Sequence, residues 1–239
     1  FEGTFERYFK FDSGGIKMKG FLITGTDTGI GKTYVGVHLA KAFLNQWIKK
    51  VGVFKPVETG VLDIPQDALA LKEAAQCCEG LEVVCPYTFR DPVAPYVASK
   101  REGRPILLSI LQDTYQRIAE RHEMIIVETA GGLMVPINEK ASYADLALLL
   151  KLPVVVVVGK RLGAINHALL TIETAKAKKL DLLGFVINEF QEDTSPGAAS
   201  VESVLKEFSN VPVLGTVHYQ GDASRVASVL SEKILEFAC

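Results

Sequence analysis

The stretch GFLITGTDTGIGKT, residues 20–33, decides the fold, because an apolar run leads into a glycine-rich turn that ends in Lys32 and Thr33. Glycines let backbone N–H groups curl around phosphate oxygens, a lysine adds positive charge, and a threonine hydroxyl can ligate Mg²⁺. The interval between Gly25 and Gly31 is one residue longer than in the usual phosphate-loop motif. A strand, this loop and a helix follow one another in the required order, so the stretch predicts a phosphate-binding loop.

Helical periodicity follows the loop directly. Over residues 32–49 apolar side chains recur at four-residue steps, at Val35, Leu39, Phe43 and Trp47. This spacing predicts an amphipathic helix that ends at Lys49 and Lys50, whose charges would complement the negative end of the helix dipole. Further helices are predicted at 67–77, 106–121, 142–150, 165–179, 198–209 and 223–237.

Short apolar runs alternate with these helices. They lie at residues 20–25, 51–55, 124–128, 153–159, 183–188 and 212–217. The runs are apolar throughout, which is typical of strands covered on both faces. We therefore predict an α/β fold of the phosphate-loop NTPase type, with a doubly wound, mostly parallel sheet and helices on both faces. Residues 18–239 are expected to form one domain, and residues 1–17 a leader that is vector-derived or an extension. The stretch 191–197 is expected to be a surface loop.

Composition excludes several classes of function. The 239 residues carry 26 Lys and Arg against 28 Asp and Glu, with no basic stretch that would follow a nucleic acid backbone. The longest apolar runs, such as 152–159, are too short to cross a bilayer, and residues 1–17 lack the apolar segment of a secretory signal. The four cysteines form no CxxC pair, so neither a zinc site nor a disulfide framework is indicated, and we expect reduced thiols in a cytoplasmic protein.

Three further polar residues stand where strands turn into helices. Lys55 ends the second strand beside the predicted loop, in position to act on a γ-phosphate. Asp67 opens a helix, where an ordinary N-cap is the alternative to a place beside a metal. Glu128 ends the third strand and precedes small residues that allow close backbone approach. With Thr33, these two carboxylates form an all-oxygen set that suits Mg²⁺.

Other sites of catalysis are not indicated. The histidines at 38, 122, 167 and 218 show no metal-ligand spacing, and solvated or structural roles are the default for them. No G-x-S-x-G turn points to a serine hydrolase.

The motifs together resemble the dethiobiotin synthetase family over about residues 20–219. The resemblance is carried by GTDTGIGKT (25–33), KPVETG (55–60), DALAL (67–71), PYTF (86–89), EGRPI (102–106), VETAGG (127–132) and LGAINHALLT (162–171). The longer interval inside the phosphate loop is also found in that family. The resemblance implies a reaction in which 7,8-diaminononanoate and CO₂ form a carbamate, ATP phosphorylates it, and the second amine closes the ring with release of ADP and phosphate.

The resemblance also implies the roles of individual residues. Lys32 and Lys55 would be catalytic, and Thr33, Asp67 and Glu128 would surround Mg²⁺. ATP would be bound by Gly29, Ile30, Gly31, Lys32, Thr33, Tyr34, Asp67, Glu128, Thr129, Ala130, Gly131, Asn188, Glu189, His218, Tyr219 and Gln220, with Asn188 facing the adenine. The diamine substrate would be bound by Thr28, Lys55 and Thr59, and by Gly163, Ala164, Ile165 and Asn166 contributed by the partner subunit of a homodimer. Gly29 and His218 depart from the glutamate and the proline that some members carry.

Two other classes share the loop. A nucleotide-switch ATPase of the partition or septum-positioning type carries an additional lysine near the start of the loop, and residues 25–30 contain none. The ATP-dependent domain of a cobyrinate-type amidotransferase normally continues into a glutaminase domain, which we do not expect here. The synthetase reading accounts for Lys32, Lys55, Asp67 and Glu128 together.

Overall fold

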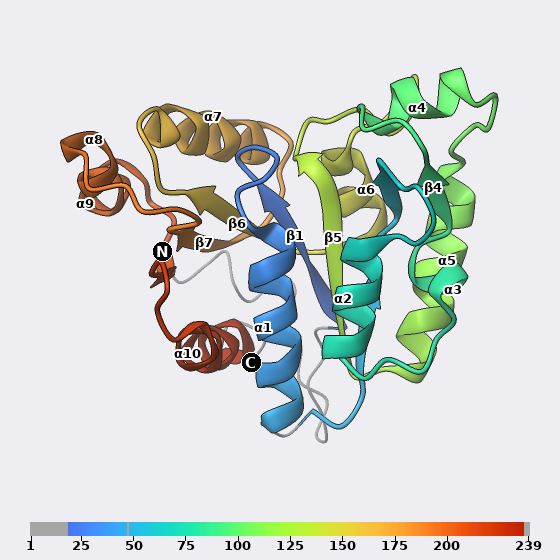
Figure 1. Cartoon of the computed structure of the whole chain (residues 1–239), viewed down its shortest axis with the longest axis horizontal. Coiled ribbons are helices and arrows are strands. Elements are labelled where there is room, and N and C mark those ends of the chain that lie inside the picture. The colour runs from blue at the N-terminus through green and yellow to red at the C-terminus, as the bar shows by residue number, and fades with distance from the viewer. Residues whose placement is uncertain (1–18, 47, 237–239) are drawn as a thin grey trace.

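The computed structural model describes residues 19–46 and 48–236. The expected leader at 1–17, the side chain of Trp47 and Cys239 lie outside the described residues. Within that part of the chain six parallel strands form the main sheet in the order β2-β5-β1-β6-β7-β8 (Figure 1). Their bounds are β1 (Gly20–Gly25), β2 (Val51–Phe54), β5 (Met124–Gly132), β6 (Val154–Gly159), β7 (Leu182–Asn188) and β8 (Val213–Val217).

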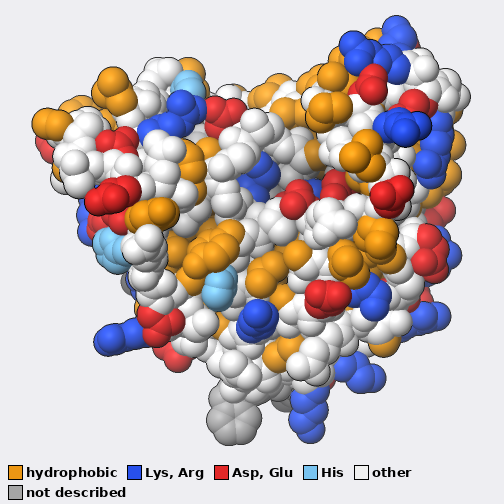
Figure 2. All heavy atoms as spheres, viewed as in Figure 1, with side chains coloured by type: hydrophobic (Ala, Val, Ile, Leu, Met, Phe, Trp, Pro, Cys, Tyr) orange, Lys and Arg blue, Asp and Glu red, His pale blue; other side chains and the backbone are white. Residues whose placement is uncertain are grey.

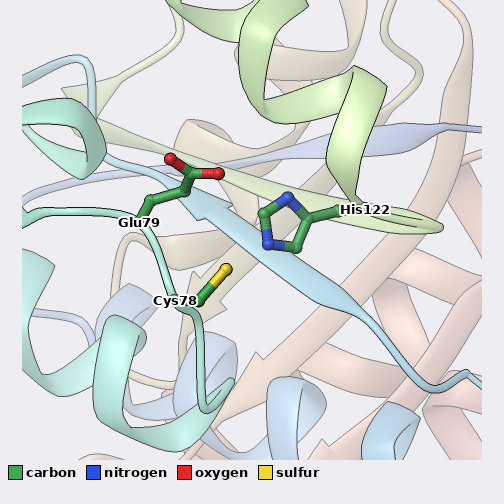
Figure 3. Close-up of side chains that lie close together, drawn as sticks. All are labelled: Cys78, Glu79 and His122. Atoms are coloured by element: carbon green, nitrogen blue, oxygen red, sulfur yellow. The ribbon is translucent and has the colours of Figure 1, made fainter.

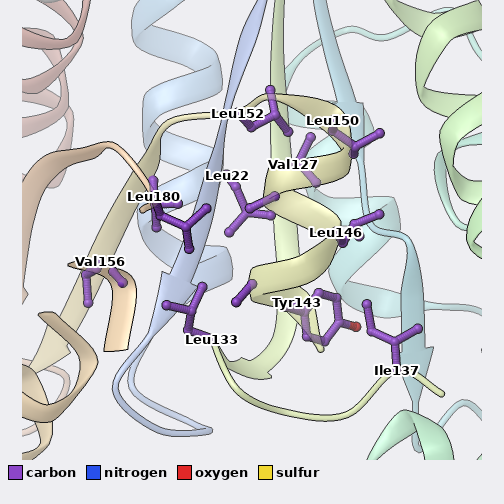
Figure 4. Close-up of a cluster of buried hydrophobic side chains, with 14 of the residues drawn as sticks. Leu22, Val127, Leu133, Ile137, Tyr143, Leu146, Leu150, Leu152, Val156 and Leu180 are labelled. Carbon is purple, nitrogen blue, oxygen red and sulfur yellow. The ribbon is translucent and has the colours of Figure 1, made fainter. Parts of the chain in front are cut away.

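Helices cover both faces of this sheet and bury a separate core on each. One face packs against α1 (Lys32–Asn45), α2 (Gln66–Ala74) and α10 (Ala223–Glu236). The other packs against α5 (Leu108–Arg121), α6 (Tyr143–Leu150), α7 (Ala164–Ala177) and α9 (Val201–Phe208), and Figure 4 shows part of this core. Alternate residues of β6 serve the two cores: Val155 and Val157 point to the first, and Val154 and Val156 to the second. The predicted doubly wound parallel fold is therefore confirmed.

The first helix is shorter than the sequence pattern predicts. It ends at Asn45, and Lys49 and Lys50 do not complete its last turn, so that part of the prediction is wrong. The N–H of Lys49 donates to the carboxylate of Glu123 at 2.9 Å, and the N–H of Glu123 donates to the carbonyl of Lys50 at 2.9 Å. The two lysines are held beside the start of β5 because the chain is already turning into β2.

Small elements between the second and third main strands escape prediction. A separate parallel pair joins β3 (Val57–Thr59) to β4 (Tyr87–Phe89), and two short helices flank it, α3 (Leu81–Val84) and α4 (Pro95–Arg101). The helix predicted at 198–209 is divided at Ser200 into α8 (Pro196–Ala199) and α9, so α8 takes the end of the expected loop at 191–197. The remaining elements begin and end within a few residues of their predicted bounds.

The N-terminus of α6 gives a prediction on acid stability. Asp145 accepts the N–H of Ser142 at 2.8 Å and lies 2.7 Å from the ammonium of Lys178. Although burial opposes ionisation, these partners lower the pKa of Asp145 to about 2. The stabilisation is complete above the ordinary pKa of 3.8 and is lost as the pH falls toward about 2.

Asp145→Asn should therefore lower the free energy of unfolding at pH 7 by about 1 kcal/mol, a value reduced for solvent screening. The difference from the wild type should shrink as the pH falls below about 4, which urea unfolding at several pH values would measure. Glu173→Gln breaks an exposed ion pair with Lys176 and is the control. An unchanged difference at pH 3 would contradict the assignment.

Candidate active site

The phosphate loop lies between the end of β1 and the start of α1. Gly31 is the N-cap of α1 and has a φ of 89°, a left-handed conformation that favours glycine. A Cβ atom at this position would lie 2.2 Å from Nδ2 of Asn188. The side chain of Asn188 in turn donates from Nδ2 to the carbonyl of Ile30 at 2.8 Å. Asn188, at the end of β7, therefore packs against the loop. Only glycine fits at position 31, because any side chain there would clash with Asn188.

Lys32 lies within the loop that precedes it. Its ammonium donates to the carbonyl of Asp27 at 2.9 Å, and its side chain is mostly buried. Burial lowers the pKa of Lys32 from its ordinary value, and the neighbouring charge of Lys55 lowers it further. Asp27 is held from the other side by Arg161, whose guanidinium lies 2.6 Å from the carboxylate. The loop is thus tied by an ion pair to the chain that leads into α7.

Lys55 is at the centre of a buried ionic network. Its ammonium lies 3.0 Å from Oδ2 of Asp67 and also donates to Oε1 of Glu128. The hydroxyl of Thr33 donates to the same Oε1 at 2.8 Å. Residues that follow β1 and β2, that open α2 and that lie in β5 therefore meet at one point, as the sequence predicts. Glu128 lies within β5, which continues to Gly132 because it pairs with β1 as far as Gly25, so the prediction that Glu128 ends its strand is wrong.

Burial sets the electrostatics of this network. Lys55 is 2% exposed and Glu128 is fully buried. Burial of Lys55 opposes its charge, but the carboxylates of Glu128 and Asp67 outweigh it and raise the pKa of the lysine above its ordinary value. For Asp67 burial opposes ionisation, and Lys55 outweighs it and lowers the pKa of the carboxyl. Lys55 is therefore a permanent cation, suited to charge stabilisation rather than to proton acceptance.

The donor set at this point suits Mg²⁺. Among the described residues Oε2 of Glu128 is buried and has no hydrogen-bond partner. The carboxylate of Asp67 and the hydroxyl of Thr33 lie beside the same lysine and glutamate. Mg²⁺ prefers oxygen ligands, and an unpartnered buried carboxylate oxygen is costly unless something binds it. The residues present fit the ion.

Glu58 holds Asp67 in position, and this role of Glu58 is not predicted from the sequence. Asp67 is not the N-cap of α2, because the helix begins at Gln66 after Pro65. Instead the carboxylate of Glu58 accepts the N–H groups of Asp67 at 3.1 Å and Ala68 at 2.9 Å. A carboxylate at a helix N-terminus satisfies free donors and complements the dipole. The sequence indicates the role of Glu58 only indirectly, because no Ser, Thr, Asp or Asn stands at the N-cap of the helix.

Glu58→Ala should lower the free energy of unfolding by about 1–2 kcal/mol, because two buried N–H groups of α2 lose their acceptor. It should also raise the Mg²⁺ concentration needed for half-maximal activity, because Asp67 loses its fixed position. Glu73→Ala, on the exposed side of the same helix, is the matched control. Equal metal dependence in the two variants would show that Glu58 does not position Asp67.

A cavity of about 360 Å³ joins these residues. Figure 2 shows this face of the molecule hollowed, with Lys or Arg and Asp or Glu side chains close together in the hollow. The cavity is lined by Thr28, Gly29, Gly31, Lys32, Thr33, Lys55, Glu58, Thr59, Asp67, Thr129, Ala130 and Gly131. Glu128 lies beneath it through its contacts with Lys55 and Thr33. Most of the predicted residues for phosphate, metal and diamine thus surround one space.

The residues predicted for the nucleoside form a second group. The carboxylate of Glu189 lies 2.5 Å from the ammonium of Lys160 and 3.2 Å from Nδ1 of His218, and it accepts the N–H of Tyr219 at 3.1 Å. Gln220 follows in a left-handed conformation. These residues, with Asn188, Ile30 and Tyr34, do not line the cavity. Their predicted contacts with the nucleotide stay predictions.

The turn Gly163 to Asn166 is at the N-terminus of α7. Gly163 is the N-cap with a φ of 88°, and the helix begins at Ala164. The turn does not line the cavity formed by its own chain. The preceding side chain, Leu162, is 77% exposed. The predicted contact between this turn and substrate across a dimer stays a prediction.

Sequence reasoning also missed Asp27, Arg161 and Lys160. Asp27 is inside the quoted loop, but its ion pair with Arg161 joins residues far apart in the chain. Lys160 and Arg161 both follow β6, the strand paired with β1. Ligands bind at the carboxyl ends of parallel strands, so the polar residues that follow β6 could have indicated that this segment lies beside the site.

Known proteins are similar to this chain over most of its length. A family profile described as an AAA domain matches residues 19–227. An ATP-dependent dethiobiotin synthetase from Anaeromyxobacter sp. (strain K) is 37% identical over 91% of this chain and 99% of its own length. Another, from Anaeromyxobacter sp. (strain Fw109-5), is 43% identical over 87% of this chain and 94% of its own. The chain belongs to the dethiobiotin synthetase family. A third member of the family, from Bacillus licheniformis, is 40% identical over 87% of this chain and 88% of its own.

Solved structures share the fold at much lower identity. A plasmid partition protein from Borrelia burgdorferi has a TM-score of 0.60 at 14% identity, covering 92% of this chain and 100% of its own. The cell division ATPase MinD from Pyrococcus furiosus has a TM-score of 0.58 at 16% identity, covering 92% and 99%. These likenesses show the phosphate-loop fold of the synthetase family and nothing about activity. No helix within residues 19–46 and 48–236 has the length and apolar character needed to span a membrane.

Proposed function

We propose that this chain is a dethiobiotin synthetase, an ATP-dependent ligase that closes the ureido ring of dethiobiotin. One amine of 7,8-diaminononanoate and CO₂ form a carbamate. The γ-phosphoryl group of ATP is transferred to a carbamate oxygen, which makes that oxygen a good leaving group. The second amine then attacks the carbamate carbon, phosphate leaves, and ADP is released.

The lysines stabilise the charge that moves during phosphoryl transfer. Lys32, at the start of α1, would bind the terminal phosphates; its hydrogen-bond partner within residues 19–46 and 48–236 is the backbone carbonyl of Asp27. Lys55 would contact both the carbamate and the γ-phosphate, because its ammonium lies at the floor of the cavity. Thr28 and Thr59 on the cavity wall would hold the diamine. These residues position two reactants whose charges otherwise repel.

Mg²⁺ would be held by Thr33, Asp67 and Glu128 and would neutralise phosphate charge when bound. The nucleoside would lie toward Asn188 and Glu189. The turn at Gly163 to Asn166, from the second subunit of a homodimer, would receive the substrate carboxylate at the N-terminus of α7. No nucleic acid or membrane is expected as a partner, and a cytoplasmic location stays a prediction.

One observation carries the proposal: the meeting of Lys55 with Asp67, Glu128 and Thr33 beside the phosphate loop. The additional lysine of a switch ATPase lies near the start of the phosphate loop, whereas Lys55 is buried directly after β2. Phosphorylation of a carboxyl group needs a cation beside the loop, because the accepting oxygen and the phosphate are both anionic.

The test is ADP release measured with ATP, Mg²⁺, 7,8-diaminononanoate and bicarbonate, with each component omitted in turn. We expect release only with the full set, and dethiobiotin in equal amount by mass spectrometry. ADP release that is independent of the diamine would refute the proposal and favour a switch ATPase. Replacing ATP with CTP or GTP in the same assay defines nucleotide preference.

A further inference from the structure

A second cluster of reactive side chains lies at the opposite edge of the main sheet. The nucleotide site is at the carboxyl ends of the strands, whereas this cluster is at their amino ends. Cys77 and Cys78 follow α2, Glu79 comes next, and His122 lies between α5 and β5. Figure 3 shows Cys78, Glu79 and His122 directed toward a common point from these two segments.

The distances within this cluster are those of a metal site. The ligand atoms of Cys78, Glu79 and His122 all lie within 4.8 Å of one another. The Sγ atom of Cys77 lies 3.7 Å from Nε2 of His122. Zinc bonds of about 2.3 Å to sulfur and about 2.0 Å to nitrogen, at a tetrahedral angle, separate the two donors by about 3.6 Å. Three donors thus lie close enough together to share one ion, and the sulfur of Cys77 lies beside the imidazole of the same group.

His122 is oriented as metal-binding histidines are. Its Nδ1 lies 2.8 Å from the carbonyl of Ile118, and a carbonyl only accepts hydrogen bonds. Nδ1 therefore carries the proton in the neutral ring, and the lone pair of Nε2 points toward the sulfur of Cys77. A backbone carbonyl on the second ring nitrogen is the usual support for a metal-ligating histidine.

The surroundings allow an ion to enter and balance its charge. A cavity of about 590 Å³ opens onto the cluster and is lined by Cys78 and His122 together with Lys49, Lys50 and Arg121. Two thiolates and one carboxylate exceed the charge of a divalent ion by one, which the nearby cations offset. Arg121 lies 3.3 Å from Glu79 but is 68% exposed, so it can leave the carboxylate at little cost.

We propose that Cys77, Cys78, Glu79 and His122 form a binding site for a thiophilic divalent cation of the Zn²⁺ class. The two sulfurs and the imidazole favour such an ion over Mg²⁺, which prefers oxygen. On binding, the two thiols release their protons to solvent. The site is independent of the proposed synthetase chemistry, because its donors and those of the nucleotide cavity share no residue.

No metal-binding motif in the sequence predicts this site. The adjacent cysteines lack CxxC spacing, and His122 is 44 residues beyond Cys78. The fold brings them together because α2 and α3, which flank the two cysteines, pack against β2, and β2 pairs with β5, which His122 precedes.

The full-length protein, stripped of metal by a chelator and kept reduced with excess Mg²⁺ present, would be titrated with Co²⁺. We expect one equivalent to bind, with a thiolate-to-cobalt charge-transfer band in the near ultraviolet and intense visible bands of a tetrahedral centre. Zn²⁺ should displace the cobalt and abolish both. Oxygen-only coordination at the nucleotide site cannot give the charge-transfer band.

Cys78→Ser is the decisive variant, because Cys78 is exposed and its change should not disturb folding. We expect its Zn²⁺ affinity, measured against a chromogenic chelator, to fall at least about tenfold. Cys239→Ser controls for the loss of a thiol, and Glu120→Gln for a charge elsewhere on the same cavity wall. Both should bind as the wild type does.

No charge-transfer band in the wild type would overturn the proposal. So would equal affinity in wild type and Cys78→Ser, or an equal loss in Cys239→Ser. Melting temperatures of the metal-free variants verify that each is folded. Ring closure needs no ion at this site, so its activity assay can fail or succeed without affecting this result.

Discussion

Lys55→Ala is expected to lower turnover by about a hundred- to a thousandfold, while ATP still binds. The ammonium of Lys55 lies among the groups that face the reacting centre, whereas the phosphate loop and Lys32 hold the nucleotide. A group that acts mainly in the transition state affects kcat more than binding. Steady-state kinetics with ring closure as readout, and fluorescence titration with an ATP analogue, would measure the two effects. A variant with nearly normal kcat would remove Lys55 from the mechanism.

The same change should destabilise the fold. Loss of the ammonium leaves Glu128 as a fully buried carboxylate without its cation, at a cost of about 3–5 kcal/mol. The double variant Lys55→Ala/Glu128→Gln removes both charges and should recover part of that loss. Urea unfolding of both variants separates a misfolded protein from an inactive one. If the double variant is no more stable than the single one, charge imbalance is not the cause.

Lys32→Ala is expected to weaken ATP binding by about ten- to a hundredfold. Its ammonium is mostly buried at the start of α1 and donates to the carbonyl of Asp27. Loss of a charged hydrogen bond to phosphate removes binding energy directly. Isothermal titration with ATP and with adenosine would test this, because adenosine lacks the phosphates and should lose nothing.

Lys41→Ala is the matched control for this measurement. Lys41 is exposed and lies nine residues beyond Lys32 on the same helix, and its loss changes the net charge equally. ATP affinity should be unchanged in this variant. Equal weakening in Lys32→Ala and Lys41→Ala would indicate a general charge effect instead of a phosphate contact.

Most of the main sheet could be predicted because its strands are continuous apolar runs. Each strand serves two cores, so residues such as Val154 and Val155 are both buried, and apolar runs of this kind stand out in a sequence. The pair β3 and β4 could not be predicted in this way. Each strand has only three residues, and these include Glu58 and Thr59 in β3 and Thr88 in β4. Too few positions remain for a period to be visible.

Some residues of the candidate site could likewise be predicted from the sequence, and others could not. Lys55 and Asp67 could be found because they stand at the end of a strand and the start of a helix, where ligands bind in parallel sheets, and Glu128 because it follows a continuous apolar run. Glu58 could not, because its role depends on α2 returning to β3. The end of α1 was mispredicted because helical periodicity continues past Asn45, whereas pairing near Glu123 draws the chain away. Long-range contacts of this kind leave no local pattern.

The ammonium of Lys55, which lies between Asp67 and Glu128, affects the conditions under which the chain can fold. A carboxylate as fully buried as that of Glu128 would ordinarily need an external cation before the surrounding structure could form. Here the polypeptide supplies its own counter-charge from the end of β2. Newly synthesised protein can therefore reach its native state before magnesium or nucleotide arrives, and refolding yields should be the same with a chelator as without one.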